Sequence, residues 1–329
     1  MKLKICVTGG SGFIGTNLIS FFEKNYEASI YNIDINSPKL IEQNIYWKKL
    51  DIRDFKKLNA YLCEINPDYI VHLAARTDLN EKKDLNKYDT NILGVKNVLT
   101  IANSLDNLKR IIVASSMLVN KVGYKPTNND DYNPDTLYGE SKKQTESITK
   151  LYNIDWVIVR PTSIWGPWFS EPYLNFFMFI YKKIYFSVPS NISSIKTYGY
   201  VENTCYQIIK ILFADQACVR HKIFYLGDYD PLNITDWADS ISLELHGKKV
   251  LKIQNKLFYL MCFFGEFIKI VGFRNFPLGL FRYKNMTTNN IIDLTNTKNI
   301  AKDLPYPDIK IQIKKTLNWL LTSNKFNKN

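Results

Sequence analysis

The sequence predicts an α/β fold, with a doubly wound parallel sheet and a smaller, mostly helical domain. Short apolar runs alternate with helical patterns from residue 1 to about 165, and this alternation is typical of parallel strands covered by helices. After Gly166-Pro167 the sequence changes to long aromatic helical patterns. We expect two domains, the larger formed by residues 1–166 and about 197–239, the smaller by about 167–196 and 240–329.

A glycine loop separates the first strand pattern from the first helix pattern. The loop reads Thr8-Gly-Gly-Ser-Gly-Phe-Ile-Gly15, behind the apolar run Leu3–Val7 and ahead of the helical pattern Phe13–Phe22. A helix N-terminus offers unpaired N–H groups, and glycines let a pyrophosphate approach the backbone. A dinucleotide site is therefore expected, with contacts from Gly9, Gly12, Phe13, Ile14 and Gly15.

The second strand pattern, Ala28–Ile33, ends in Asp34. This acid lies about 20 residues past the loop, where a carboxylate can accept both ribose hydroxyls of NAD and would repel a 2′-phosphate. A solvated loop aspartate is the alternative. The combination of strand, spacing and acid favours NAD as the cofactor.

Four further apolar runs predict buried strands, namely Tyr69–Leu73, Arg110–Ala114, Trp156–Val159 and the later Lys222–Leu226. The second of these delivers Ser115 and Ser116 to the carboxyl end of the sheet, where such folds place their ligands.

A tyrosine and a lysine four residues apart open the helix that runs from Tyr138 to about Tyr152. This spacing puts Tyr138 and Lys142 on one helix face, with Cβ atoms about 5–6 Å apart. A fixed cation favours the phenolate of a neighbouring tyrosine. We expect Tyr138 to act as the base on a sugar hydroxyl, Lys142 to supply the charge and Ser116 to hydrogen-bond the reacting oxygen.

Composition narrows the class of protein. The 329 residues carry a formal net charge of +12, which is compatible with a nucleotide diphosphate, but no nucleic-acid-binding signature accompanies it. Five scattered cysteines and three isolated histidines predict neither disulfides nor a metal site, and His72 is expected to be structural. The first residues enter a strand without a signal-peptide pattern, so we expect a cytoplasmic location.

Two apolar stretches, Tyr173–Val188 and Leu257–Phe273, are interrupted by charged residues. Neither is long enough to cross a membrane, and we expect no integral membrane segment. Buried or partly buried helices are the first interpretation. A contact of the second stretch with a membrane surface stays open.

Several motifs occur together in one order. The chain resembles extended short-chain dehydrogenase/reductases of the NAD-dependent epimerase/dehydratase type, which contain a Rossmann domain, and nucleotide-sugar 4-epimerases in particular. The resemblance rests on TGGSGFIG (8–15), Asp34, LDIRD (50–54), HLAA (72–75), NILGV (91–95), ASS (114–116), YGESK (138–142), VRPTSIWGP (159–167) and YGYVEN (198–203).

The resemblance implies further roles in cofactor binding. It places Asp51 and Ile52 beside the adenine, Leu73, Ala74 and Ala75 along the cofactor cleft, and Ser115, Pro161 and Ile164 near the cofactor, with Tyr138 and Lys142 as base and cofactor clamp. Asn91 matches a family asparagine that we interpret as structural.

The residues that follow Ser116 indicate which reaction of the family is expected. Related dehydratases have an Asp-Glu pair after the catalytic serine, whereas this chain has Met117 and Leu118, which cannot protonate a leaving hydroxide. A 4-epimerase, which needs only transient oxidation and return of the hydride, is ranked first. A 4-keto-sugar reductase or dehydrogenase is the alternative, and a non-catalytic NAD-binding sensor or scaffold is less favoured.

The expected substrate-binding residues match the motifs of the resembled family less closely than the cofactor-binding residues do. Lys196 stands where relatives often have an arginine for the nucleotide diphosphate, and Arg282 is the other candidate phosphate ligand, with a solvated surface arginine as its alternative. The expected partners are a nucleotide-diphosphate sugar and, by analogy with relatives, a second copy of the chain in a homodimer.

Overall fold

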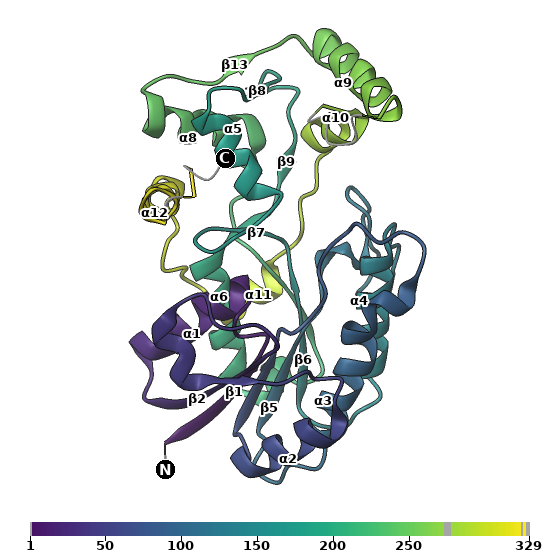
Figure 1. The fold of residues 1–329 in the computed structure, drawn as a ribbon, viewed down its shortest axis with the longest axis vertical. Coiled ribbons are helices and arrows are strands. Elements are labelled where there is room, and N and C mark those ends of the chain that lie inside the picture. The colour runs from purple at the N-terminus through teal and green to yellow at the C-terminus, as the bar shows by residue number, and fades with distance from the viewer. Residues whose placement is uncertain (1, 273–277, 324, 327–329) are drawn as a thin grey trace. The chain divides into compact units, whose positions relative to one another are not determined.

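A computed structural model describes residues 2–272, 278–323 and 325–326 (Figure 1). The chain forms two compact units. The first contains residues 1–168, 199–228 and 293–307, and the second contains 169–198, 229–292 and 308–329.

The first unit is built on a seven-stranded sheet in the order β11-β6-β5-β4-β1-β2-β3, and every neighbouring pair is parallel. This arrangement confirms the predicted fold class. The strands are β1 (Leu3–Thr8), β2 (Ala28–Asp34), β3 (Trp47–Lys49), β4 (Tyr69–His72), β5 (Arg110–Ala114), β6 (Trp156–Pro161) and β11 (Ile223–Leu226). The helices are α1 (Phe13–Asn25), α2 (Phe55–Ile65), α3 (Val95–Ala102), α4 (Leu137–Thr149), α6 (Val201–Leu212), α7 (Gln216–Val219) and α11 (Thr295–Ile300).

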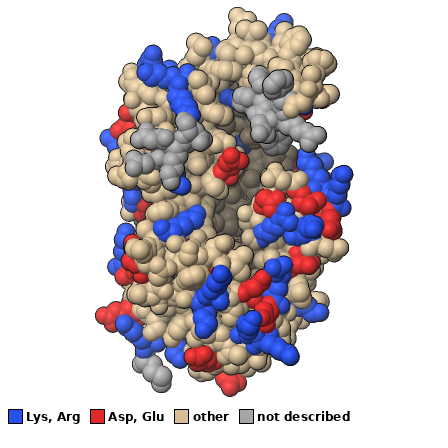
Figure 2. All heavy atoms as spheres, in the orientation of Figure 1, with Lys and Arg blue, Asp and Glu red and all other residues tan. Residues whose placement is uncertain are grey.

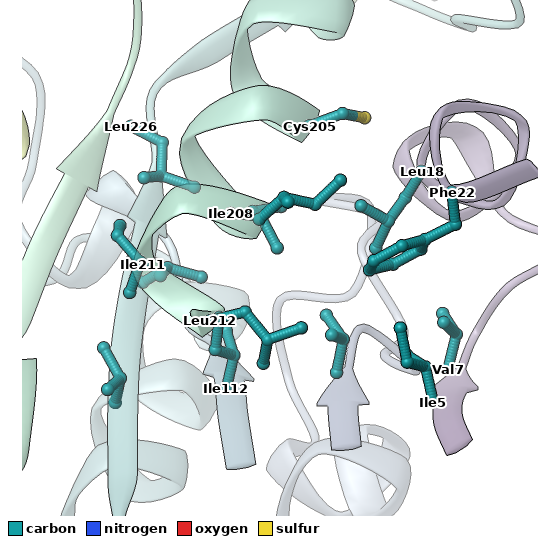
Figure 3. Close-up of a cluster of buried hydrophobic side chains, with 14 of the residues drawn as sticks. Ile5, Val7, Leu18, Phe22, Ile112, Cys205, Ile208, Ile211, Leu212 and Leu226 are labelled. Atoms are coloured by element: carbon teal, nitrogen blue, oxygen red, sulfur yellow. The ribbon is translucent and has the colours of Figure 1, made fainter. Parts of the chain in front are cut away.

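Alternating strand residues feed two separate cores, as the period of a strand requires. On one face, Ile5 and Val7 of β1 pack in a cluster with Leu18 and Phe22 of α1 and with Ile208 of α6 (Figure 3). Cys6, between the two β1 residues, belongs to the opposite cluster, to which α2 and α3 contribute. Both faces of the sheet are therefore covered, and its strands read as continuous apolar runs.

A buried ion pair ties the start of β5 to its surroundings. Arg110 is 4% exposed and its guanidinium lies 3.0 Å from the carboxylate of Asp155. The same guanidinium donates to the carbonyls of Ile211, Leu212 and Ala214 at the end of α6. Because the ion pair is almost entirely buried, its two side chains depend on each other and on these carbonyls for partners.

The second unit contains α5 (Tyr173–Tyr181), α8 (Ile234–His246), α9 (Asn255–Ile270), α10 (Leu280–Thr287) and α12 (Ile309–Thr322). Its short strands pair as β8 (Phe186–Ser187) with β13 (Leu251–Lys252) and β9 (Ile195–Lys196) with β12 (Leu232–Asn233). Trp237 is buried among aromatic rings, with the Phe176 and Tyr198 centroids each 4.8 Å away. No helix in the described part of the chain is long and apolar enough to cross a membrane.

The unit boundaries differ from the expected ones in two places. Residues 229–239 belong to the second unit, because they enter α8, which packs on α5 and α12. Residues 293–307 belong to the first unit, because α11 packs on α6 and β11, where Thr297 donates to the Tyr225 carbonyl at 2.6 Å. Polar helices of this length carry too little pattern to assign to a core.

The Arg110 network gives a stability prediction. Arg110→Leu removes the buried partner of the Asp155 carboxylate and one donor to each of the three carbonyls, so we expect the free energy of unfolding to fall by about 3 kcal/mol. Lys109→Leu is the matched control, since Lys109 is exposed and pairs with Asp68 at the surface, and it should cost less than about 1 kcal/mol. Urea unfolding measures both, and equal losses would contradict the assignment.

Candidate active site

The glycine loop joins β1 to α1 with a backbone that only glycine allows. Gly9 has a φ of +74°, and a Cβ there would lie 2.5 Å from the backbone nitrogen of Ala74. A Cβ on Gly15 would lie 2.3 Å from the carbonyl oxygen of Gly9. Gly12 caps α1 without a side-chain hydrogen bond, and the first turn of the helix has no acidic residue. The start of α1 is therefore suited to an anion such as a pyrophosphate.

Asp34, at the end of the neighbouring strand β2, is held next to this loop. One carboxylate oxygen accepts from the backbone N–H of Ser11 at 3.1 Å, and the other accepts from Asn36 at 2.9 Å. Partial burial raises the pKa of Asp34, although these N–H groups oppose the shift. A fixed carboxylate beside a phosphate-binding loop fits the ribose of NAD.

The residues expected near the adenine are held in place by their neighbours. Asp51 forms an ion pair with Arg53 at 2.6 Å, and hydrogen bonds from Arg53 lower the pKa of Asp51. The side-chain amide of Asn97 donates to the carbonyls of Ile52 and Arg53 at 3.0 and 3.1 Å. Ile52 is buried and packs against Gly94. A Cβ on Gly94 would lie 2.5 Å from the Ile52 side chain.

The segment after β4 is fixed to the glycine loop. Leu73 donates its N–H to the Thr8 carbonyl at 2.9 Å, and the Thr8 hydroxyl also bonds the His72 ring at 2.7 Å. Burial lowers the pKa of His72 to about 3, as expected of a structural histidine. The predicted cleft residues Leu73, Ala74 and Ala75 thus lie at the carboxyl ends of β1 and β4.

The predicted catalytic tyrosine and serine meet in the structure. The Thr136 hydroxyl caps α4 by accepting from Gly139, and a Cβ on Gly139 would lie 2.2 Å from the Leu118 carbonyl, so the helix start sits directly on the serine loop. Tyr138 is 8% exposed, and its hydroxyl lies near enough to the Ser116 side chain for the serine to lower its pKa. The Ser116 hydroxyl also accepts from the backbone of Leu118 at 3.1 Å.

Burial, and not a cation, dominates the ionisation of Tyr138. Burial raises its pKa to about 12, and only the hydrogen bond with Ser116 lowers it in part. Desolvation of the buried phenol is the largest cause of this shift. The expected positive charges of Lys142 and of oxidised NAD act in the opposite direction and favour the phenolate.

Lys142 is itself buried, one helical turn after Tyr138. Its ammonium donates to the Ala114 carbonyl at 2.7 Å. Burial lowers the pKa of Lys142 to about 8, while the charge of Glu146 opposes the shift. The lysine is thus fixed at the end of β5, beside the two serines.

Glu146 is the main residue of the site that sequence reasoning missed. It is fully buried and pairs with Arg160 of β6 at 2.7 Å, which is also fully buried. The Ser115 hydroxyl donates to Glu146 at 2.5 Å, and the Tyr132 hydroxyl does so at 2.8 Å. Two sequence signals could have found this pair: a glutamate four residues after Lys142 on the same helix face, and an arginine inside an apolar strand.

The remaining predicted positions in the first unit have definite surroundings. The Ser115 hydroxyl donates to Glu146 and its N–H to the Val159 carbonyl, so a cofactor contact from Ser115 would use its oxygen atoms as acceptors. Pro161 ends β6, and Ile164 is 8% exposed. The Asn91 side chain bonds the backbone of Arg76 at 2.8 and 2.9 Å, which supports the structural interpretation.

The two candidate phosphate ligands, Lys196 and Arg282, lie in the second unit. Lys196 is 6% exposed and donates to the Asn285 side chain, and burial lowers its pKa to about 8. Arg282, one turn before Asn285 on α10, stacks over the rings of Tyr185 and Phe186 at 5.3 and 5.5 Å. It is therefore not a fully solvated arginine, and its buried Nη2 has no hydrogen-bond partner among the described residues.

Comparison with known proteins identifies the family. The sequence profile of the NAD dependent epimerase/dehydratase family matches residues 5–226. The chain belongs to this family. The match confirms the predicted resemblance and, with it, NAD as the cofactor, which the glycine loop and Asp34 fit.

Individual relatives of this epimerase/dehydratase chain align over part of their length. One from Methanocaldococcus jannaschii, provisionally assigned as a UDP-glucose 4-epimerase, is 31% identical over 49% of this chain and 56% of its own. The N-acetyl-α-D-glucosaminyl-diphospho-ditrans,octacis-undecaprenol 4-epimerase of Escherichia coli O157:H7 is 30% identical over 50% of each chain. The chain therefore spans about half the length of these curated relatives.

A solved structure agrees in fold over the whole chain. The UDP-glucuronic acid 4-epimerase of Bacillus cereus, in complex with UDP-glucuronic acid and NAD, has a TM-score of 0.74 at 18% identity and covers 98% of this chain and 100% of its own. At this identity the likeness shows the fold.

The buried ammonium of Lys142 gives a pH prediction. Its pKa in the folded chain is about 8, below the value in the unfolded chain, so the unfolded state binds more protons above pH 8 and stability rises with pH there. Relative to Lys142→Met, the wild type should gain about 2 kcal/mol of unfolding free energy between pH 8 and pH 10.

The control is Lys143→Met, because Lys143 is the exposed neighbour on the same helix. Unfolding curves of the three proteins at several pH values make the comparison. A wild-type curve parallel to that of Lys142→Met would show that Lys142 is not buried as a titrating group.

Proposed function

We propose that the chain is an NAD-dependent epimerase that inverts a hydroxyl-bearing carbon, first of all C4, of a sugar carried on a nucleoside diphosphate. The observation that carries the proposal is that buried Tyr138 lies beside Ser116, with buried Lys142 one turn away. Ser116, Tyr138 and Lys142 meet at the carboxyl edge of the parallel sheet. The glycine loop after β1 and Asp34 at the end of β2 lie at the same edge. A binding protein has no need of such a pair.

The roles of the chain's own groups follow from their bonds. When bound, NAD supplies a hydride acceptor and a positive charge. Tyr138 takes the proton from the sugar hydroxyl and returns it to the same oxygen, and Ser116 donates a hydrogen bond to that oxygen throughout. Lys142, held by the Ala114 carbonyl, keeps a positive charge near both.

A dehydratase is not proposed. The two positions after Ser116 lie in a short 3₁₀ turn, Met117–Val119, whose three side chains are apolar. Elimination of water needs an acid for the leaving hydroxide, and neither Met117 nor Leu118 supplies one.

A second candidate is a sugar-nucleotide dehydrogenase or reductase. The GDP-6-deoxy-D-talose 4-dehydrogenase of Aggregatibacter actinomycetemcomitans is 27% identical over 50% of this chain, and such a reaction would use the same three residues. A panel of nucleotide sugars separates the two functions. Epimers without net NADH indicate the epimerase, and stoichiometric NADH indicates the dehydrogenase.

The substrate class is proposed from the relatives. UDP-glucose 4-epimerases of Mycoplasma genitalium and Vibrio cholerae are 30% and 23% identical to this chain, so UDP-hexoses come first in the panel. We predict a cytoplasmic location, where the chain would meet nucleotide sugars. We also predict a homodimer formed through α3 and α4, which light scattering tests.

The proposed base gives a kinetic prediction. Tyr138→Phe should lower kcat about 10³-fold, since it removes the proton acceptor. Tyr88→Phe is the matched control, because its ring lies 6.3 Å from that of Tyr138 while its hydroxyl donates to the Asp78 carbonyl. It should keep kcat within a few fold. An unchanged rate in Tyr138→Phe, measured by chromatography of the epimers, would refute the proposed base.

The proposed phosphate ligand gives a binding prediction. Arg282→Met should raise the KM for the nucleotide sugar about tenfold, with little change in the Kd of NAD, because a charged hydrogen bond to the diphosphate is lost. Arg220→Met, at an exposed arginine of the first unit that bonds the Asn153 carbonyl, is the control. Equal KM values in both variants would remove Arg282 from the substrate site.

A further inference from the structure

Helix α9 exposes most of its apolar side chains. Phe258, Cys262 and Gly265 are the residues that it buries; the Phe258 ring lies 6.0 Å from that of Phe186, and a Cβ on Gly265 would meet the Leu278 carbonyl at 2.7 Å. Seven apolar side chains of α9 and its C-cap are between 49% and 78% exposed, namely Leu257, Leu260, Phe263, Phe264, Phe267, Ile270 and Val271. The apolar stretch Leu257–Phe273 expected from the sequence thus packs against the rest of the chain along one narrow side of the helix. Its last residue, Phe273, lies outside the described residues.

These exposed side chains share one side of the helix. At about 100° per residue they fall within roughly half of its circumference, opposite the buried residues, along a helix about 24 Å long. In Figure 2 the surface where Figure 1 draws α9 is mostly uncharged. A continuous exposed patch of this kind indicates an interaction surface.

Exposed apolar side chains also occur on the strand pair next to α9. Leu251 of β13 is 70% exposed and pairs with Phe186 of β8, and Ile184, just before β8, is 56% exposed. Phe186 touches Phe258 from the buried side of α9. The strand pair on which the buried side of α9 packs thus has exposed apolar side chains of its own.

Cationic residues flank the patch. From Leu245 to Ile292 the sequence has eight Lys or Arg residues and one acid, Glu266. Lys248, Lys249, Lys252, Lys256 and Lys284 are exposed. Asp239 faces this segment and pairs with both Lys249 and Lys252, at 4.0 and 3.1 Å, and Glu266 pairs with Lys269 at 3.5 Å. These two carboxylates leave a large excess of positive charge.

We propose that α9 docks on an anionic lipid bilayer, with its exposed apolar face in the headgroup region and the flanking lysines on lipid phosphates. Phenylalanine and leucine on one side of a helix and lysines around it are the features of an interfacial helix. A second copy of the chain fits less well, because it would bring two sets of these lysines together. The proposal concerns a surface of the second unit and does not depend on the proposed activity.

The experiment compares binding of the full chain to vesicles of equimolar phosphatidylglycerol and phosphatidylcholine with binding to phosphatidylcholine alone, by sedimentation without sugar substrate. The wild type should bind the anionic vesicles, and higher salt should weaken this binding. Phe263→Ser/Phe267→Ser should reduce it at least tenfold. The control Ile41→Ser/Leu151→Ser also removes two exposed apolar side chains, each 82% exposed, and should bind as the wild type does.

Two outcomes would overturn the proposal. One is equal sedimentation of the wild type and the Phe263→Ser/Phe267→Ser variant with anionic vesicles, or no sedimentation of either. The other is a wild-type dimer in light scattering that this variant converts to a monomer, which would make the patch an interface between copies. Circular dichroism and thermal unfolding of both variants check that they fold.

Discussion

The buried carboxylate of Glu146 is the constraint on which the arrangement of the site depends. A fully buried charge must be compensated by partners in fixed positions, and Glu146 takes them from three places: Arg160 of β6, Ser115 after β5 and Tyr132 from the loop before α4. These bonds fix the rotation of α4 against the sheet. Tyr138 and Lys142, on the same side of α4, are thereby brought to Ser116 and the Ala114 carbonyl.

The same burial that orders the site opposes its ionisation. It raises the pKa of Tyr138 to about 12 and lowers that of Lys142 to about 8, so each group is pushed toward its neutral form. A positive charge from the cofactor would reverse this tendency for the tyrosine. On the proposed function, oxidised NAD would therefore favour removal of a proton by Tyr138.

The sequence could predict those parts of the site that are local in the chain. The glycine loop, Asp34 and the Tyr138–Lys142 pair each follow from a short motif, and the parallel sheet follows from the alternation of elements. Glu146 and Arg160 were missed because their partnership joins a helix to a strand, and only the fold brings them together. The engagement of Ser115 by Glu146 has the same origin.

Tertiary contacts also explain the other differences. The assignment of α8 and α11 to their units depends on packing that polar helical patterns do not encode. Composition does not distinguish the exposed side of α9 from a buried one, because the sequence of an apolar helix is similar whether protein or lipid covers it. Arg282 was left open between two interpretations until its stacking on Tyr185 and Phe186 was seen.

The most direct test of the account is the pKa of Tyr138 with and without NAD, measured by nuclear magnetic resonance of tyrosine labelled with ¹³C at Cζ and assigned with Tyr138→Phe. The account predicts that the Tyr138 resonance of the free protein titrates well above the ordinary range of tyrosine, and that saturation with NAD lowers this pKa substantially. A Tyr138 that titrates at its ordinary pKa in the free protein, or whose pKa is unchanged by NAD, would contradict it.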